Sequence, residues 1–353
     1  MINSIMEKNN LDAVIVSDPY NMRKLSGFSG GEGFVYISGK KSVIITDSRY
    51  IEAAEKELNE GFELIMCDVN RTQSAILKEL AERDGAGAIG YEDRHLTVAQ
   101  FNDLKIKCGF NNLVPLKNSL TELRIIKTEE EIEKLRIAES IGDKAFEHVL
   151  NIIRVGMTEL EVAAEIEYAM KLNGAASLSF DTIVASGPNS SLPHAVPGNR
   201  VISEGDFVLM DFGCKYDGYC SDMTRTVVMG SASDKQIEIY NTVLKAQLEA
   251  MKVIKSGVPG REVHMAALGV IEKAGYGDCF GHGLGHSVGM YIHESPRFSL
   301  GEKEKIYAGT IETVEPGIYI PGFGGVRIED MIVVTEDGFE NLTKSPKDLL
   351  EIK

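Results

Sequence analysis

Two acidic residues lie on what the sequence predicts to be a pair of neighbouring strands. Asp211 interrupts the apolar run Val208–Phe212, and Asp222 opens the segment Asp222–Val227. Asp217-Gly218 between them is typical of a two-residue hairpin turn, which places Asp211 opposite Thr224. Asp222 is then the diagonal neighbour of Asp211 on the same face, within about 7–8 Å. Two carboxylates on an apolar face repel each other unless a cation neutralises them. The alternative is a surface hairpin with two unrelated acids, and the apolar flanks count against it.

A second pair of acids follows the same plan further along the chain. Glu315 and Glu329 flank the glycine-rich turn Pro321–Gly325, and a loop centred near Gly322 would place them directly opposite each other. Pro316 favours an extended backbone at Glu315. Four carboxylates from two hairpins match the charge of two divalent ions, and a bridging carboxylate suits ions about 3.5–4 Å apart.

Three histidines lie between these two pairs of acids, at positions 282, 286 and 293. The surrounding glycines make a helix unfavourable, so a ligand pair four residues apart is not established. The segment is not an HExxH motif either, because Arg297 stands in place of the second histidine and Pro296 would break the helix. One imidazole ligand beside four carboxylates is the prediction, and the spacing leaves open which histidine supplies it. Such a ligand set favours a hard or borderline ion such as Mn²⁺.

An internal repeat predicts how these acids are positioned. The segment Ile153–Gly156 is echoed by Ile254–Gly257, at an offset of 101 residues, and Gly174 is matched by Gly275. In both copies a long amphipathic helix is predicted to end at the first glycine and a shorter helix to end at the second. Chance similarity between helix pairs is the alternative. We expect a duplicated ααββ unit with pseudo-twofold symmetry, whose two sheets face a shared cleft.

The first 120 residues alternate strand and helix patterns. Predicted strands are Ala13–Val16, Phe34–Ile37, Ser42–Thr46 and Gly85–Gly90, and predicted helices are Ser48–Glu60 and Thr72–Arg83. Gly39-Lys40 marks a hairpin turn. A Thr-x-x-Glu capping box at Thr128 opens a long helix. We therefore predict an α/β domain at residues 1–124 and a second domain at residues 125–353.

Composition restricts the class of protein. With 353 residues, 43% hydrophobic and 25% charged, the chain is typical of a soluble two-domain protein. A net charge of −16 argues against nucleic acid or an anionic membrane as a partner. The first 14 residues do not resemble a signal peptide, and five cysteines do not form a disulfide framework. These features predict a cytoplasmic protein with reduced thiols.

Four ordered motifs resemble a known family. They are DFG-x₈-DMTRT (Asp211–Thr226), GHGLGHSVG-x₃-HE (Gly281–Glu294), VEPGIY (Val314–Tyr319) and GVRIED (Gly325–Asp330). The chain resembles the pita-bread metallopeptidases of family M24, in their Xaa-Pro branch of aminopeptidase P and prolidase. The stretches Tyr20–Gly31 and Thr46–Tyr50 resemble the smaller domain that these enzymes share with creatinase. The resemblance covers nearly the full chain and implies a pita-bread catalytic domain after a creatinase-like α/β domain.

The resemblance assigns roles to individual residues. The implied metal ligands are Asp211, Asp222, His286, Glu315 and Glu329. The implied catalytic residues are His194, His293, Glu315 and Arg327. The implied substrate-binding residues are His282, Tyr319, Arg297, Phe180 and Ile183. Two divalent ions per subunit are expected, with Mn²⁺ favoured and Co²⁺ or Zn²⁺ as alternatives.

The activity implied by the resemblance is cleavage of the N-terminal Xaa-Pro bond of peptides by a hydroxide that bridges two divalent ions. We expect an Xaa-Pro aminopeptidase, which acts on peptides with proline at the second position and assembles as a homodimer. A prolidase restricted to dipeptides is the main alternative. A methionine aminopeptidase-like enzyme shares the ligands, and a non-enzymatic binding protein could share the fold.

Overall fold

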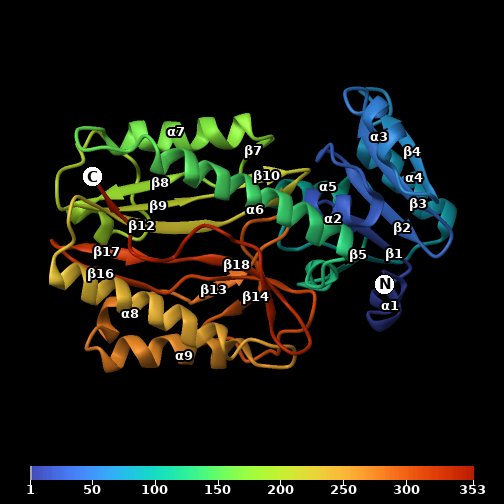
Figure 1. Ribbon diagram of the computed structural model, residues 1–353. Coiled ribbons are helices and arrows are strands. Elements are labelled where there is room, and N and C mark those ends of the chain that lie inside the picture. Colours follow the sequence, from blue (N-terminus) through green and yellow to red (C-terminus); the bar gives the residue numbers. More distant parts are fainter. Residues whose placement is uncertain (1) are drawn as a thin grey trace. The chain divides into compact units, whose positions relative to one another are not determined.

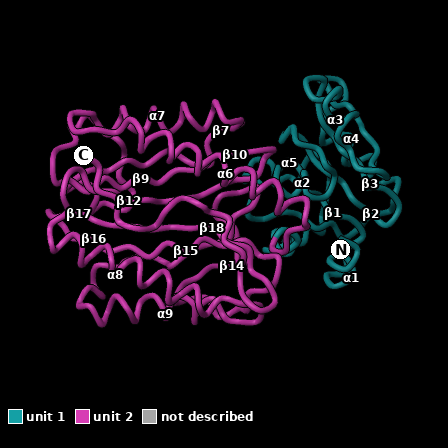
Figure 2. Tube along the Cα trace, in the orientation of Figure 1, with its two compact units in different colours: residues 1–124 teal, residues 125–353 magenta. Residues whose placement is uncertain are grey.

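The computed structural model describes residues 2–353 and divides the chain into two compact units (Figures 1 and 2). Unit 1 comprises residues 1–124 and unit 2 comprises residues 125–353. Among the described helices, none is both long enough and apolar enough to cross a membrane. All five cysteines are free thiols.

Unit 1 is a six-stranded mixed sheet with helices on both faces. Its strands, in order across the sheet, are β4 (Phe62–Cys67), β3 (Ser42–Asp47), β2 (Phe34–Ser38), β1 (Ala13–Val16), β5 (Ala88–Tyr91) and β6 (Asn112–Pro115). Its helices are α1 (Ile2–Lys8), α2 (Pro19–Ser26), α3 (Ile51–Glu57), α4 (Gln73–Asp84), α5 (Val98–Ile106) and the 3₁₀ turn η1 (Thr121–Arg124). The predicted strands and the turn at Gly39-Lys40 are confirmed, although β5 begins three residues later than predicted and α3 is shorter.

Alternation along β1 explains why both faces of this sheet are covered. Ala13 and Ile15 pack with the buried residues of α4 and α5, whereas Val14 and Val16 pack with those of α1, α2 and α3. Successive side chains of a strand point to opposite faces, so an uninterrupted apolar strand requires cover on both sides. Residues 13–16 therefore form the centre of unit 1.

Unit 2 contains two helix pairs and two principal sheets. The helices are α6 (Glu129–Leu150), α7 (Glu159–Leu172), α8 (Asp234–Met251) and α9 (Gly260–Lys273). The first sheet has the order β20 (Glu351–Ile352), β12 (Met223–Met229), β9 (Phe207–Phe212) and β8 (Ile183–Ser186). The second has the order β14 (Glu294–Phe298), β13 (Gly285–Ser287), β15 (Ile311–Val314), β18 (Asp330–Val334) and β19 (Phe339–Asn341).

Smaller elements complete unit 2. They are the sheet of β11 (Tyr219–Cys220), β10 (Cys214–Tyr216) and β7 (Ser177–Leu178), the pair β16 (Gly317–Ile320) and β17 (Gly324–Arg327), and the 3₁₀ turns η2 (Gly187–Ser191) and η3 (Gly277–Cys279). Figure 1 shows the two sheets of unit 2 between α6 and α7 on one side and α8 and α9 on the other.

The predicted duplication is present in unit 2. Gly174 and Gly275 follow the ends of α7 and α9 as predicted, whereas α6 and α8 end at Leu150 and Met251, six residues before Gly156 and Gly257. All four glycines have positive φ angles. Glycine reaches this region at no steric cost, which makes it the usual residue after a helix. Each half then packs its helix pair on its own sheet through a separate apolar core. The capping box at Thr128 is also confirmed.

The first predicted hairpin register is confirmed, with one adjustment. Asp211 on β9 pairs with Thr224 on β12, and the tight turn lies at Asp217-Gly218. The adjustment concerns Asp222, which lies between β11 and β12 and not within a continuous strand. The polypeptide departs from the ladder next to the two acids.

The second hairpin also has the predicted register, but its ladder is interrupted at the acids. Val314 pairs with Asp330 and Gly317 pairs with Arg327, so Glu315 and Glu329 lie opposite each other between the two paired segments. Pro316 explains the interruption because it has no N–H to donate to a ladder. Glu315 and Glu329 therefore stand at the junction where the strand pair β15–β18 gives way to β16–β17.

Candidate metal centre

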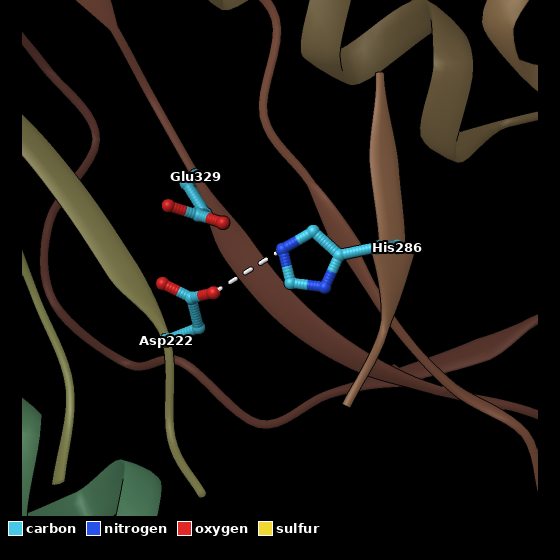
Figure 3. A group of neighbouring side chains, drawn as sticks. All are labelled: Asp222, His286 and Glu329. Carbon is cyan, nitrogen blue, oxygen red and sulfur yellow. Dashed lines mark ion pairs between the residues drawn. The ribbon is translucent and has the colours of Figure 1, made fainter. Parts of the chain in front are cut away.

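Three of the predicted ligands form a compact buried group. The ligand atoms of Asp222, His286 and Glu329 all lie within 4.8 Å of one another (Figure 3). His286 Nε2 is 3.4 Å from Asp222 Oδ2, the contact dashed in Figure 3, and 3.6 Å from Glu315 Oε1. Asp222, His286 and Glu329 are all buried, with exposed fractions from 1% for Glu329 to 7% for His286. Four of the five predicted ligands therefore meet around one imidazole nitrogen.

The imidazole of His286 is held by its own strand. His286 lies on β13. Its backbone N–H donates to Thr313 Oγ1 at 3.1 Å, and its ring Nδ1 lies 3.2 Å from the carbonyl oxygen of Ser287. A proton on Nδ1 would satisfy that carbonyl and leave Nε2 as the free electron pair facing the carboxylates. The local backbone thus orients the nitrogen that a cation would bind.

A chain of hydrogen bonds joins the remaining acids across the two halves. Thr224 Oγ1 donates to Glu329 Oε2 at 2.6 Å and accepts from Arg327 Nε at 3.0 Å. Arg327 Nη2 donates to Asp211 Oδ2 at 2.5 Å, and its Nη1 donates to the Tyr319 hydroxyl at 2.7 Å. Asp211, the fifth predicted ligand, is therefore paired with Arg327 and is not part of the three-residue group.

Crowding of buried carboxylates changes their proton affinities. Burial, followed by the charges of Glu329 and Asp211, raises the pKa of Asp222 well above its usual value. Burial and the charge of Glu315 do the same to the pKa of Glu329. Burial raises the pKa of Glu315 to about 8, against the opposing charge of Arg327. Since burial also lowers the pKa of His286 to about 3, the imidazole stays neutral and able to act as a ligand.

These residues fit a pair of divalent cations. The buried Asp211 Oδ1 has no hydrogen-bond partner among the described residues, which is costly for a carboxylate oxygen unless a cation approaches it. Nearby positive charge would also reverse the raised carboxylate pKa values, because it favours the ionised form. The donor set of four carboxylates and one neutral imidazole suits divalent ions that accept oxygen and nitrogen ligands.

Most of the other predicted site residues line the same cleft, which has a volume of about 490 Å³. Its lining includes the five candidate ligands together with Phe180, Ile183, His194, His282, His293, Arg297 and Arg327. Tyr319 is the exception, because it is only 7% exposed and does not line the cleft. Its hydroxyl lies 3.0 Å from His282 Nε2 and accepts from Arg327, so it supports two residues that do line the cleft.

Two residues that the sequence did not single out contact this network. Thr224 links Glu329 to Arg327, as described above. Glu139 of α6 is fully buried, accepts from the N–H of Asp222 at 3.3 Å, and accepts from Thr343 Oγ1 at 2.6 Å. Both had a signal in the sequence: Thr224 continues the alternate positions that begin at Asp222, and Glu139 interrupts the apolar face of a helix.

Family models place the chain among the peptidases. The model of metallopeptidase family M24 matches residues 133–336, and that of the creatinase/prolidase N-terminal domain matches residues 2–126. The M24 match covers more than half of the chain. The chain belongs to metallopeptidase family M24, with the pita-bread fold in unit 2 and a creatinase-type domain in unit 1. It is a metallopeptidase, as the motifs predicted.

Individual relatives span nearly the whole chain. An Xaa-Pro dipeptidase from Pyrococcus furiosus is 39% identical over 346 residues, which cover 98% of this chain and 97% of that protein. A solved Xaa-Pro dipeptidase from Bacillus anthracis has a TM-score of 0.95 and 42% identity, over 99% of this chain and 97% of that one. A solved X-Pro aminopeptidase from Thermotoga maritima has a TM-score of 0.92 and 34% identity, over 99% and 100% of the two chains.

Proposed function

We propose that this metallopeptidase is an Xaa-Pro dipeptidase, which hydrolyses the bond between the first residue and proline in dipeptides. This differs from our first expectation, an aminopeptidase acting on longer peptides, and takes up its main alternative. The relatives described above include enzymes of both kinds, and the two dipeptidases are the more similar in sequence, at 39% and 42% identity against 34%.

The observation that carries the proposal is an unpaired guanidinium in the cleft. Arg297 on β14 lies across the ladder from His286, is exposed, and lines the cleft. Among residues 2–353 its guanidinium makes no hydrogen bond or ion pair, whereas the guanidinium of Arg327, which lines the same cleft, is bonded to Asp211. In an Xaa-Pro dipeptide the carboxylate follows the scissile bond after a single residue. Arg297 is suited to bind that carboxylate, since a guanidinium matches its geometry in a bidentate manner.

The acids of the site would hold the metal ions and move the proton. Asp211, Asp222, His286, Glu315 and Glu329 would be the ligands of two divalent ions, and Mn²⁺ is the ion we propose. When bound, such ions supply Lewis acidity and lower the pKa of a water molecule. Glu315 accepts a proton from the attacking water and passes it to the proline nitrogen. Because that nitrogen belongs to a tertiary amide, it leaves only after protonation.

Two histidines would hold the substrate carbonyl. His293 lies with its ring centroid 4.5 Å from that of His286, and both His293 and His194 line the cleft and are exposed. Partial desolvation within the cleft and the charge of Arg297 lower the pKa of His293, which favours the neutral imidazole near pH 7. A neutral imidazole N–H donates to the oxygen of the developing tetrahedral intermediate without bringing a charge near the ions.

Three substrates test the proposal with Mn²⁺-loaded protein: Ala-Pro, Ala-Pro-amide and Ala-Pro-Ala. Loss of a charge-assisted hydrogen bond costs about 1.5–3 kcal/mol, so we expect kcat/KM for Ala-Pro-amide to fall about 10–100-fold below that for Ala-Pro. Ala-Pro-Ala should be poorer still. Equal or faster release of alanine from Ala-Pro-Ala would establish the aminopeptidase instead. Cleavage of Met-Ala peptides with no activity on the proline substrates would exclude both.

A variant separates Arg297 from general effects on the site. Arg297→Met should lower kcat/KM for Ala-Pro about 10–100-fold while leaving that for Ala-Pro-amide within about threefold. Arg261→Met, which removes an exposed arginine on α9, is the matched control and should change neither value. Mass spectrometry of metals, with light scattering in the same preparation, tests the expected two ions per subunit and the homodimer.

A further inference from the structure

A buried lysine lies close to the start of unit 2, outside the cleft. The side chain of Lys127 is only 2% exposed. Its Nζ donates to Glu294 Oε2 at 3.1 Å, to Ser287 Oγ at 3.2 Å and to the carbonyl oxygen of Ile125 at 3.3 Å. A buried ammonium is tolerated only where it is paired and its N–H groups are satisfied, and these three acceptors satisfy all of them.

The partner carboxylate holds the loop that carries His293. Glu294 follows His293 directly, and its Oε1 accepts from the N–H of Tyr291 at 3.3 Å. On the other side of the loop, a Cβ at Gly289 would lie 2.5 Å from Glu294 Oε2, so the backbone there packs directly on the carboxylate. The Glu294 side chain therefore contacts both sides of the loop at residues 288–293.

The same lysine also reaches the strand that carries His286. Ser287 follows His286, and it pairs with Glu294 on one side and with Glu312 on the other. Glu312 is fully buried with no hydrogen-bond partner for either carboxylate oxygen, and burial raises its pKa well above the usual range. The carboxylate that contacts the ammonium of Lys127 is therefore that of Glu294, at 3.1 Å, and not that of Glu312.

We propose that Lys127 is a positioning residue for His293, acting through the carboxylate of Glu294 and the loop at residues 288–293. Lys127 does not line the cleft and touches none of the candidate ligand side chains. Its effect on the reaction must therefore pass through backbone that it holds. The inference rests on the proposed function, because it requires His293 to act on the substrate.

Loss of Lys127 should slow the reaction because the imidazole of His293 is exposed and is held in place through its loop. His293 is exposed in the cleft, and it owes its place to the short loop that bears it. Without Lys127, Glu294 would be a buried carboxylate without its cation and would turn towards solvent or take up a proton. Either change releases Gly289 and Tyr291 from their contacts, and a shift of about 1 Å in a catalytic group costs about 100-fold in rate.

The first measurement uses Lys127→Met with Mn²⁺-loaded full-length protein and Ala-Pro as substrate. We expect kcat to fall about 10–100-fold, KM to stay within about threefold, and both metal ions to be retained. Lys252→Met is the control, because Lys252 also pairs with a glutamate, Glu249 at 2.7 Å, but is 68% exposed. Its kcat should match that of the unaltered protein.

The second measurement combines each change with His293→Ala. If Lys127 acts through His293, adding Lys127→Met to His293→Ala should alter kcat by less than about threefold, since residues that act as a unit are not additive. A purely structural role would multiply the two losses. Glu294→Gln should behave like Lys127→Met in both backgrounds, and it serves as the test if Lys127→Met does not fold.

The outcomes separate this inference from the proposed function. Multiplicative losses in the double variant, unaltered kcat in Lys127→Met, or loss of a metal ion from it would each overturn the positioning role. An unaltered kcat in His293→Ala would instead overturn the catalytic role of His293 in the proposed function. A fall in kcat that disappears in the His293→Ala background supports the inference.

Discussion

The two halves of unit 2 share a frame but contribute differently to the site. Asp211 and Asp222 come from one hairpin, and Glu315 and Glu329 come from the other. The registers differ, because Asp211 lies opposite Thr224 whereas Glu315 lies opposite Glu329. The position that the 101-residue repeat relates to His286 is Ala185. Each half thus contributes two carboxylates, whereas the imidazole comes only from the second half.

The first half keeps apolar residues where the second half has polar ones. Ala185 on β8 pairs with Leu209 on β9, and both are fully buried. In the second half, His286 bonds to Thr313, two residues before Glu315, just as Leu209 precedes Asp211 by two. The comparison teaches that the duplicated frame sets the charge of the site, while single substitutions at corresponding positions add the imidazole and its partner.

The halves are also joined by bonds that neither could make alone. Arg225 of β12 is 1% exposed and donates to Asp330 Oδ1 at 2.8 Å and to the carbonyl oxygen of Glu329 at 2.5 Å. Thr224, its neighbour, donates to the carboxylate of Glu329. The carboxylate pair of the second half is therefore held in part by the first half.

Removing one carboxylate from either half should have the largest effect and tests their equivalence. Asp222→Ala and Glu329→Ala should each abolish activity, by about 1,000-fold or more in kcat, and release metal, because each takes a ligand from the compact group. Metal content and kcat measured together check this. Asp217→Asn, on the same hairpin as Asp222, is the control and should leave both unchanged. Full activity in Asp222→Ala would refute the metal assignment.

Cutting the link between the halves should have the next largest effect. Thr224→Val removes the hydroxyl that donates to Glu329 and accepts from Arg327 at nearly constant volume. Hydrogen-bond partners of metal ligands typically contribute 10–100-fold, so we expect metal affinity to fall by about that factor. Titration of metal-stripped protein with Mn²⁺ measures it. Thr226→Val is the control, because the hydroxyl of Thr226 bonds to the backbone of Arg327 and to no candidate ligand. It should change the affinity for Mn²⁺ by less than about threefold.

Stability of the metal-stripped protein should depend on pH through both halves. The folded pKa values of Asp222, Glu315 and Glu329 lie above their usual values, that of Glu315 at about 8. Between about pH 4 and pH 8 the folded chain then binds more protons than the unfolded chain, so stability falls as pH rises. We expect a loss of about 5 °C in Tm from pH 5 to pH 8.

Metal binding should remove that pH dependence, because cations favour the ionised carboxylates. Calorimetry of metal-loaded and metal-stripped protein compares the two slopes. Asp222→Asn and Glu329→Gln, each removing one charge from one half, should flatten the slope of the stripped protein to a similar extent. A Tm of the metal-stripped protein that rises from pH 5 to pH 8 would contradict the assignment of raised carboxylate pKa values.

The smallest predicted effect concerns a helix start that differs between the halves. Thr158 caps α7 through a capping box, whereas Pro259 at the corresponding position of α9 has no side-chain cap. Thr158→Ala should cost about 1 kcal/mol, or about 2–4 °C in Tm, with kcat within twofold. Thermal unfolding measures it, and Thr242→Ala is the control, because Thr242 is a half-buried residue inside α8 whose hydroxyl donates to the carbonyl oxygen of Glu238 and caps no helix. An equal loss in both variants would mean that the cap contributes nothing specific.

Local patterns in the sequence determined the frame of the site. The Asp217-Gly218 turn set the pairing of Asp211 with Thr224, and the glycine-rich turn near Gly322 set the pairing of Glu315 with Glu329. Hairpin registers follow from neighbouring residues, because turn geometry leaves few alternatives. Gly174 and Gly275 likewise predicted the ends of α7 and α9, whereas the long helices end six residues before the first glycine of each copy. The resemblance added the family and the candidate ligands. It rested on four short motifs, which are also local features of the sequence.

Only the tertiary structure decided which side chains support that frame. Lys127 meets Glu294 across 167 residues, Arg327 meets Asp211 across 116, and Thr224 meets Glu329 across 105. No periodicity predicts such contacts, because they arise where independently formed elements pack together. The cost of burying an unpaired charge or polar group then selects partners from whatever the packing brings within reach. For this reason the acids of the cleft could be predicted from the sequence, whereas the contacts that Glu139 and Lys127 make behind them could not.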